Sequence, residues 1–172
     1  MNKILEVDAR LSVSLRVAEN PGTLRTVAAI LAHSGDSWFW LLGLGVVWLL
    51  GDAYWRGLAV LFAVGILVTA VIVMAIKFTV RRKRPEGEWG GIYRRTDPHS
   101  FPSGHAARAI LLAVLALGAG PSWLALLLLP WSLAVMFARV AMGLHYLSDV
   151  LAGALVGALV GLCILLVPLG WV

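Results

Sequence analysis

Three short clusters in this 172-residue sequence place acid–base or anion-binding residues at the ends of apolar segments. The last cluster, ARVAMGLHYLSD, begins near Arg139 and holds His145 four residues before Asp149, so a helix there would bring imidazole and carboxylate to one face. A carboxylate that holds one ring nitrogen fixes the tautomer and leaves the other nitrogen as a base or nucleophile. Such a pair also occurs around metals. No further carboxylate or cysteine completes a ligand set here, so we expect no metal site.

The middle cluster, FPSGHAARA, predicts the start of a helix that could bind an anion. Ser103 is a suitable N-cap, and Gly104 allows a ligand to approach the backbone closely. The free amide groups of the helix would face that ligand, and His105 in the first turn could give it a proton. A plain helix cap is the alternative interpretation. One turn further, Arg108 is expected to contact lipid headgroups.

The first cluster, KFTVRRKRP, adds cations. Lys77 follows a run of apolar residues, so its ammonium group must either reach the interface or bind an anion. Arg84 comes seven residues later, and the three basic residues 81–83 are expected to be solvated or to contact headgroups. Together the clusters supply cations, a hydroxyl, a helix N-terminus and two histidines. Phosphoryl transfer requires this inventory.

The elements that carry these clusters belong in a membrane. Hydrophobic residues make up 60% of the chain and charged residues only 13%, which is more apolar surface than a soluble domain of this length could bury. Apolar runs long enough to cross a bilayer predict helices. We therefore expect an all-α integral membrane protein with a bundle of five transmembrane helices, or alternatively six. The predicted spans are residues 37–51, 57–80, 104–120, 122–139 and 149–169.

The N-terminal residues 1–35 predict two amphipathic helices that lie on the membrane surface. Apolar residues recur at helical spacing until an Asn-Pro-Gly turn at 20–22 ends the first helix. A second helix ends at Gly35, and Asp36 is expected to cap the next one. We expect these interfacial helices to anchor the bundle of residues 36–172 and to line no site, with the whole chain forming one domain.

Small residues in the last span predict close helix packing. Gly153, Gly157 and Gly161 recur every four residues, a spacing that lets helix backbones approach where lipid provides no hydrophobic drive. The single cysteine, Cys163, lies in the same span and is expected to serve packing, since it has no partner for a disulfide.

The basic residues are strongly biased to one side of the membrane. If the five spans alternate in direction, every Lys and Arg except Arg56 falls on the face that holds the three clusters. The positive-inside rule places such a face in the cytoplasm. That rule does not explain histidines at membrane depth, which are costly and usually functional. We expect a prokaryotic inner-membrane protein whose site faces the cytoplasm.

In their order along the chain, the three clusters resemble the signature of the type 2 phosphatidic acid phosphatase family, which includes vanadium haloperoxidases and glucose-6-phosphatase. The resemblance covers about residues 77–149, and Ala138 departs from it because the family often has serine there. The matching residues are Lys77-x6-Arg84-Pro85, Pro102-Ser103-Gly104-His105 and Arg139-x5-His145-x3-Asp149.

The resemblance implies a metal-independent phosphatase that needs no cofactor and works by double displacement. His145 would attack phosphorus with Asp149 orienting it, and His105 would protonate the leaving oxygen and later activate water. The residues expected to bind the phosphate oxygens are Lys77, Arg84, Ser103, Gly104 and Arg139.

The position of the site indicates the substrate class. A site at the rim of the bilayer is reached more easily by a lipid phosphate than by a soluble one, so we expect a membrane lipid substrate and no nucleic-acid partner. Candidates are phosphatidylglycerol phosphate, phosphatidic acid and a polyprenyl phosphate. Two alternatives stay open: a phosphotransferase that uses the same phosphohistidine, and a non-catalytic lipid-binding protein. The sequence does not define an oligomeric state.

Overall fold

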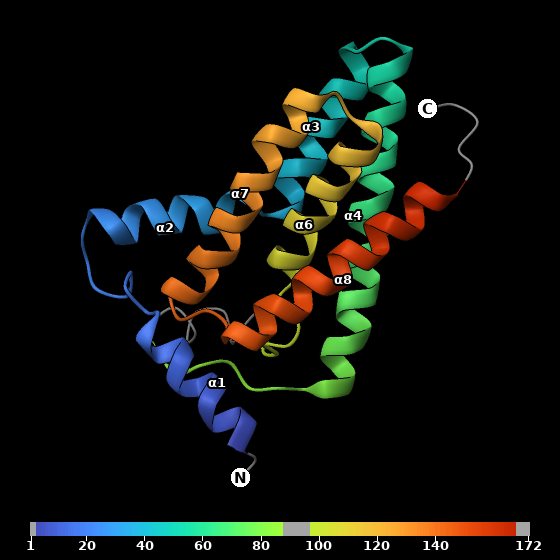
Figure 1. The fold of residues 1–172 in the computed structure, drawn as a ribbon. Helices are drawn as coiled ribbons and strands as arrows, with labels where there is room; N and C mark the ends of the chain where they lie inside the picture. Colours follow the sequence, from blue (N-terminus) through green and yellow to red (C-terminus); the bar gives the residue numbers. More distant parts are fainter. Residues whose placement is uncertain (1–2, 88–96, 168–172) are drawn as a thin grey trace.

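The structure is a computed structural model that describes residues 3–87 and 97–167. Within these ranges the chain is helical, and its one β-type contact is an isolated bridge between Lys83 and His99. Figure 1 shows the helices in order along the chain. They are α1 (Lys3–Ser14), α2 (Thr23–Ser34), α3 (Ser37–Leu50), α4 (Ala53–Val80), α6 (Gly104–Ala119), α7 (Ser122–Ala141) and α8 (Leu147–Leu166).

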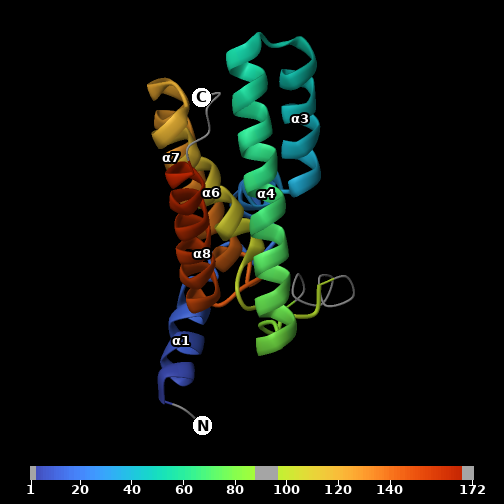
Figure 2. The ribbon, with the colours of Figure 1, turned by 90° about the vertical axis from the view of Figure 1, so that its right-hand side faces the viewer.

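Five apolar helices form the bundle, which confirms the predicted all-α membrane fold. The helices α4, α7 and α8 are long and apolar enough to cross a bilayer, whereas α3 and α6 have only 14 and 16 residues. Their bounds lie within a few residues of the predicted spans. No sixth apolar helix occurs in residues 3–87 and 97–167. In Figure 2, α3 lies beside α4, and α6 lies between α4 and the pair α7 and α8.

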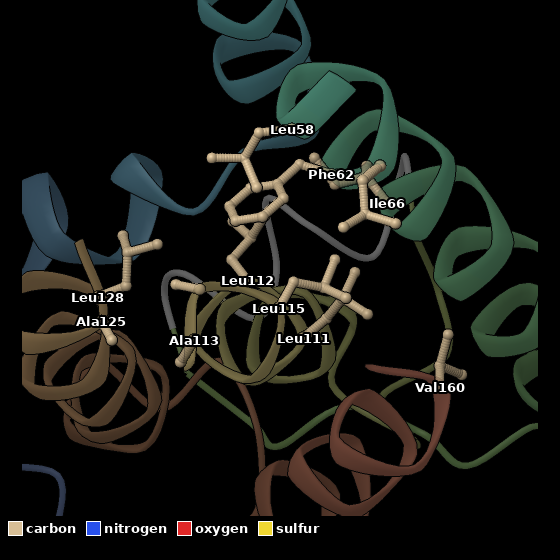
Figure 3. Close-up of a cluster of buried hydrophobic side chains, with 12 residues drawn as sticks. Leu58, Phe62, Ile66, Leu111, Leu112, Ala113, Leu115, Ala125, Leu128 and Val160 are labelled. Atoms are coloured by element: carbon tan, nitrogen blue, oxygen red, sulfur yellow. The ribbon is translucent and has the colours of Figure 1, made fainter. Parts of the chain in front are cut away.

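Helix α6 is the centre of the bundle because it packs against α4, α7 and α8. The main hydrophobic core fills the space between α6 and α4 (Figure 3), and this packing fixes the position of the α6 N-terminus. The large side chains that meet there include Leu58, Phe62 and Ile66 from α4 and Leu111, Leu112 and Leu115 from α6.

Two glycines of α8 let that helix lie directly against α6, as their spacing predicted. A Cβ atom added at Gly157 would meet the backbone carbonyl of Ala107, and one added at Gly153 would meet that of Ser103. Both contacts fall inside the 3.0 Å that real Cβ atoms keep. The close approach brings the beginning of α8 to the beginning of α6.

The first surface helix is shorter than predicted. Helix α1 ends at Ser14 rather than at the turn at 20–22, because the following residues bind the end of α7. The amide of buried Ala18 donates to the carbonyl of Ala141 at 3.0 Å, which draws the chain out of the helix. A tertiary hydrogen bond of this kind leaves no trace in the apolar periodicity.

The two faces of α1 have opposite roles. Val7 and Leu11 are exposed, as expected of a helix that rests its apolar face in a membrane surface. Asp8 and Ser12 are buried against the protein, and the Ser12 hydroxyl accepts from the Leu147 amide at 2.8 Å. Helix α2 lies across the bundle in Figure 1 and packs on α7.

Four helix termini that carry the three clusters meet at one end of the bundle (Figure 1). Helices α4 and α7 end there, and α6 and α8 begin there, because consecutive long helices run in opposite directions. Residues far apart in the sequence are thereby placed in one layer.

Candidate active site

One cavity of about 230 Å³ lies where these helix termini meet. Its lining includes Lys77 of α4, Gly104 and His105 of α6, and His145 of the turn before α8. The three clusters therefore contribute to a single cavity, although they are separated by tens of residues in the sequence. Asp97 also lines it, from the loop between α4 and α6.

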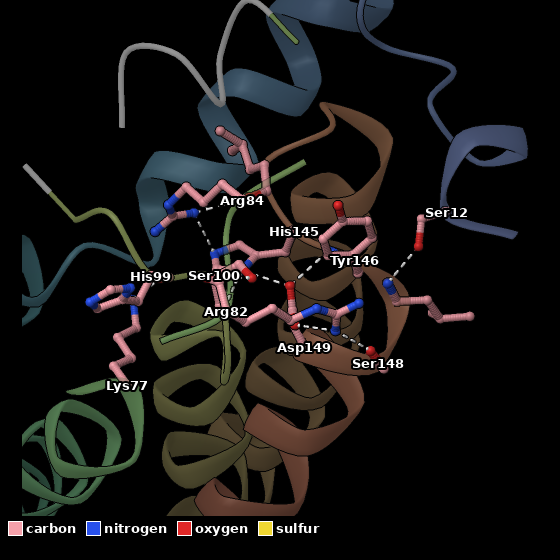
Figure 4. A network of polar contacts seen from close by, with 12 residues as sticks. Ser12, Lys77, Arg82, Arg84, His99, Ser100, His145, Tyr146, Ser148 and Asp149 are labelled. Atoms are coloured by element: carbon pink, nitrogen blue, oxygen red, sulfur yellow. Dashed lines mark hydrogen bonds and ion pairs between the residues drawn. The ribbon is translucent and has the colours of Figure 1, made fainter. Parts of the chain in front are cut away.

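The hydrogen bonds of His145 define its tautomer (Figure 4). Its Nδ1 atom lies 2.8 Å from the carbonyl oxygen of Ser100, which can only accept, so Nδ1 carries the proton. Its Nε2 atom lies 3.1 Å from Nη1 of Arg84, which can only donate, so Nε2 holds the lone pair. Nε2 is therefore the ring nitrogen whose lone pair can serve as a base or nucleophile.

The surroundings of His145 keep it uncharged. Burial of the ring, together with the positive charges of Arg139, Arg84 and Lys77, holds the pKa of His145 well below its ordinary value. A neutral imidazole at neutral pH is the form that can act as a nucleophile.

Asp149 is not the direct hydrogen-bond partner of His145 that the sequence spacing predicted. Its Oδ2 atom lies 3.7 Å from Nδ1 of His145 and accepts instead from the Tyr146 amide at 2.9 Å. This arrangement arises because Asp149 occupies the third position of α8, where its carboxylate forms a capping box with Tyr146. The carboxylate still places a buried negative charge beside the imidazole.

Arg82 is not the solvated or headgroup-binding charge that was predicted for residues 81–83. Its Nη1 atom donates to Oδ1 of Asp149 and to the Ser148 hydroxyl, each at 2.7 Å. Its Nη2 atom donates to Asp8 of α1 at 2.7 Å, and its guanidinium lies 4.0 Å from the Tyr146 ring centroid. These contacts connect the surface helix α1 to the carboxylate of the site.

Lys77 and Arg84 are buried and share one carboxylate partner. Oδ2 of Asp97 accepts from Nζ of Lys77 and, at 2.7 Å, from Nη2 of Arg84. Burial tends to raise the pKa of Asp97, but the hydrogen bond and charge of Lys77 and the charge of Arg84 outweigh it and hold that pKa below its ordinary value. Lys77 therefore does not extend to the interface.

Gly104 lines the cavity at the start of α6, and Ser103 directly precedes it. The Ser103 hydroxyl is fully buried and has no hydrogen-bond partner within the described part of the chain, while its amide donates to the Asp149 carbonyl at 2.8 Å. A Cβ added at Gly104 would make only an ordinary contact with Val73 at 3.5 Å. Protein packing alone therefore does not demand glycine there, in agreement with a residue that faces a ligand.

Arg139 is buried at the end of α7. Its positive charge acts on Lys77, His105 and His145, which places it within electrostatic reach of the cavity. Its backbone carbonyl accepts from the His145 amide at 3.3 Å and so holds the turn that carries the histidine.

His105 contacts a residue that the sequence analysis assigned elsewhere. Its Nε2 atom lies 2.6 Å from Oδ1 of Asp36, which occupies the N-cap position of α3 but makes no side-chain cap. Ser37 at the start of α3 lines the cavity, so the beginning of α3 contributes to the site. Arg108, expected at the headgroups, donates to the Gly35 carbonyl instead.

All the cavity-lining residues of the described chain except Ser37 lie in a segment with a known sequence profile. Residues 58–171 match the PAP2 superfamily. The chain belongs to the PAP2 superfamily. It is an integral membrane phosphatase, as the three clusters predicted.

Two relatives of this PAP2 chain are lipid phosphatases by name. The decaprenylphosphoryl-5-phosphoribose phosphatase of Mycobacterium tuberculosis is 30% identical over 160 residues, which cover 86% of this chain and 82% of the relative. The lipid A 4'-phosphatase of Bacteroides thetaiotaomicron is 29% identical over 126 residues, which cover 66% of this chain and 56% of the relative.

Two solved structures share the fold of this PAP2 chain. The transmembrane PAP2-type phosphatidylglycerolphosphate phosphatase of Bacillus subtilis superposes with a TM-score of 0.75 at 21% identity, covering 95% of this chain and 85% of that one. LpxE of Aquifex aeolicus superposes with a TM-score of 0.74 at 21% identity, covering 91% and 93%.

Three charged residues at the PAP2 site were missed as site residues: Asp36, Arg82 and Asp97. Each has a common structural role at its position, as a helix cap, a membrane-surface charge or a loop charge. A usable signal was present in the charge balance. The chain has only 9 acidic residues against 14 basic ones. A buried cation needs a carboxylate partner, so each aspartate near the clusters was a candidate partner for a cation of the site.

Proposed function

We propose that this protein is a metal-independent lipid phosphate phosphatase that transfers the phosphoryl group to His145 and then to water. The observation that carries the proposal is that His105 and His145 line the same cavity as Lys77. Two imidazoles beside a cation at one cavity can flank a single phosphorus atom, one as nucleophile and the other as acid.

His145 acts as the nucleophile through Nε2. The Ser100 carbonyl holds the proton on Nδ1, and Nε2 lies 3.1 Å from the Arg84 guanidinium, which would bind the phosphate oxygens. When Nε2 bonds to phosphorus the ring becomes cationic. The buried carboxylate of Asp149, 3.7 Å from Nδ1, then stabilises that charge.

His105 acts as the acid and then as the base. It protonates the lipid oxygen as the P–O bond breaks, and it later removes a proton from the water that attacks the phosphohistidine. The Ser103 hydroxyl and the Gly104 amide at the start of α6 bind phosphate oxygens together with Lys77 and Arg139.

The substrate is a lipid phosphate. The side of the cavity formed by α4 is mostly apolar, with Ile66, Val73 and Met74 beside Thr69 along the wall that leads to Lys77. Such a wall suits the hydrocarbon-bearing side of a phosphoester better than a sugar or nucleotide. The M. tuberculosis and B. thetaiotaomicron relatives are named for polyprenyl-linked and lipid A phosphates, which supports a membrane lipid here.

Phosphate release tests this function. The detergent-purified protein is expected to release phosphate from lipid phosphates in the presence of a chelator, using a panel of phosphatidylglycerol phosphate, phosphatidic acid, and a polyprenyl phosphate and its pyrophosphate. Transfer of the phosphoryl group to a lipid acceptor without free phosphate would instead identify a phosphotransferase. No turnover of any panel member would contradict the proposal.

Asp97 is expected to compete with the substrate phosphate. Its carboxylate already binds Lys77 and Arg84, so Asp97→Asn should strengthen inhibition by orthovanadate, a phosphate analogue, about fivefold, the worth of a partly exposed ion pair. The matched control is Glu86→Gln, which removes one exposed negative charge after α4. Weaker vanadate inhibition in Asp97→Asn than in the control would show that Asp97 instead organises the two cations.

We further propose that the site faces the cytoplasm, because alternation of the predicted spans assigns every Lys and Arg of the sequence except Arg56 to the side of the three clusters. In a Cys163→Ala background, Glu86→Cys should resist an impermeant thiol reagent in intact cells, whereas Asp52→Cys, between α3 and α4, should react. Both side chains are exposed in the structure. The reverse labelling pattern would place the site outside.

A further inference from the structure

The ring of His105 is held by a carboxylate that lies outside the PAP2 match. Nε2 of His105 is 2.6 Å from Oδ1 of Asp36, and the match begins only at residue 58. Oδ2 of the same carboxylate lies 3.5 Å from Nδ1 of His33. The hydrogen bond from His105 outweighs burial and holds the pKa of Asp36 below its ordinary value, so Asp36 is an anion at neutral pH.

A comparison with Asp52 shows that Asp36 does not serve as the helix N-cap that its position would suggest. Asp36 and Asp52 occupy the N-cap positions of the adjacent helices α3 and α4. Asp52 accepts from the Trp55 amide at 3.1 Å, as an N-cap normally does. Asp36 makes no such bond and directs its carboxylate at His105 instead. Helix α3 therefore lacks a side-chain N-cap, and the carboxylate that would have formed it binds His105.

The two residues before Asp36 are held by hydrogen bonds from three side chains, on α3, α6 and α7. Arg108 donates to the Gly35 carbonyl. Nε1 of Trp131 donates to the Ser34 hydroxyl and Nε1 of Trp40 to the Ser34 carbonyl, both at 2.9 Å. A Cβ atom at Gly35 would lie 3.2 Å from Cδ2 of His105, so the joint between α2 and α3 packs tightly against the imidazole.

We propose that Asp36 is the positioning residue for the acid–base histidine, acting on the substrate only through His105. The inference rests on the proposed function. Asp36 holds the proton on Nε2 and leaves Nδ1 as the atom that exchanges a proton with the substrate. It also stabilises the cationic ring that precedes proton donation.

The two chemical steps balance around Nδ1. In the first, Nε2 of His145 bonds to phosphorus, the P–O bond to the lipid breaks, and the proton on Nδ1 of His105 moves to the leaving oxygen. In the second, a water oxygen bonds to phosphorus, the N–P bond breaks, and a water proton returns to Nδ1 of His105. Throughout both steps the second proton of His105 stays on Nε2, where it is hydrogen-bonded to the Asp36 carboxylate.

A comparison of leaving groups separates this role from a merely structural one. An alkoxide leaving group needs a proton, whereas a phenoxide leaves far more readily without one. Asp36→Asn should therefore lower kcat/KM for dodecyl phosphate by about 10- to 100-fold and for para-octylphenyl phosphate by less than about threefold. The matched control is Asp52→Asn, which neutralises the aspartate at the neighbouring N-cap and should leave both values near wild type.

The outcomes distinguish the inference from the function beneath it. If wild type hydrolyses both esters and His145→Gln neither, but Asp36→Asn loses the same factor on both, Asp36 is only structural and the inference fails alone. If wild type hydrolyses neither ester, the proposed function fails and the inference with it. Asp36→Glu, which restores the charge, should recover part of the dodecyl phosphate activity; no recovery in a folded Asp36→Glu protein would also count against the inference.

Discussion

Replacing His145 with glutamine should abolish phosphate release, lowering kcat by at least about 10⁴-fold. Glutamine is similar in length and polar, but it has no nitrogen lone pair that could attack phosphorus. The imidazole is buried, with Nδ1 bound to Ser100 and Nε2 beside Arg84. A nucleophile from solvent therefore cannot take its place. The measurement is single-turnover phosphate release from the best lipid of the panel.

His99→Gln is the matched control for this change. The side chain of His99 packs on the Phe78 ring, with centroids 5.9 Å apart, and only its backbone carbonyl contacts Lys77. The control should therefore keep most of its activity. A folded His145→Gln protein with more than about a hundredth of wild-type activity would show that another residue attacks phosphorus.

Replacing Gly157 with alanine should destabilise the bundle by about 2 kcal/mol or more, although it adds a single methyl group. The added Cβ would meet the backbone carbonyl of Ala107, which cannot move aside as a side chain can. Helices α6 and α8 would have to separate, and their N-termini carry His105 and Asp149. Both the melting temperature in detergent and the activity should fall.

Gly45→Ala provides the control, because a Cβ at that position of α3 meets nothing within 4 Å. Alanine also favours a helix over glycine by about 1 kcal/mol, so this variant should melt at or above the wild-type temperature. Equal melting temperatures for Gly157→Ala and Gly45→Ala would contradict the close packing of α6 and α8.

The membrane helices could be predicted because a bilayer demands long continuous apolar runs, which are visible in the sequence one residue at a time. The C-terminal end of α1 could not be predicted from the sequence. Its apolar periodicity continues past Ser14, but the chain turns there because Ala18 binds the Ala141 carbonyl. The choice depends on a partner more than a hundred residues away, and nothing local encodes it.

Some residues of the candidate site could likewise be predicted from the sequence, and others could not. His105 and His145 could be predicted because a histidine at the end of an apolar membrane helix is costly and seldom serves packing alone. The partners were missed because aspartate and arginine have common structural roles at such positions. Asp36 and Asp52 look alike as N-caps in the sequence, yet only Asp52 makes the cap. Which aspartate turns to a histidine depends on where α6 lies beside the α2–α3 joint.

Trapping the covalent intermediate tests the central claim most directly. The protein is mixed with a radiolabelled lipid phosphate, quenched in alkali, where phosphohistidine is stable, and the labelled peptide is mapped. We expect the phosphoryl group on His145, with no label in His145→Gln. Label on His105 or on an aspartate, or full turnover with no labelled protein at any time point, would contradict the account.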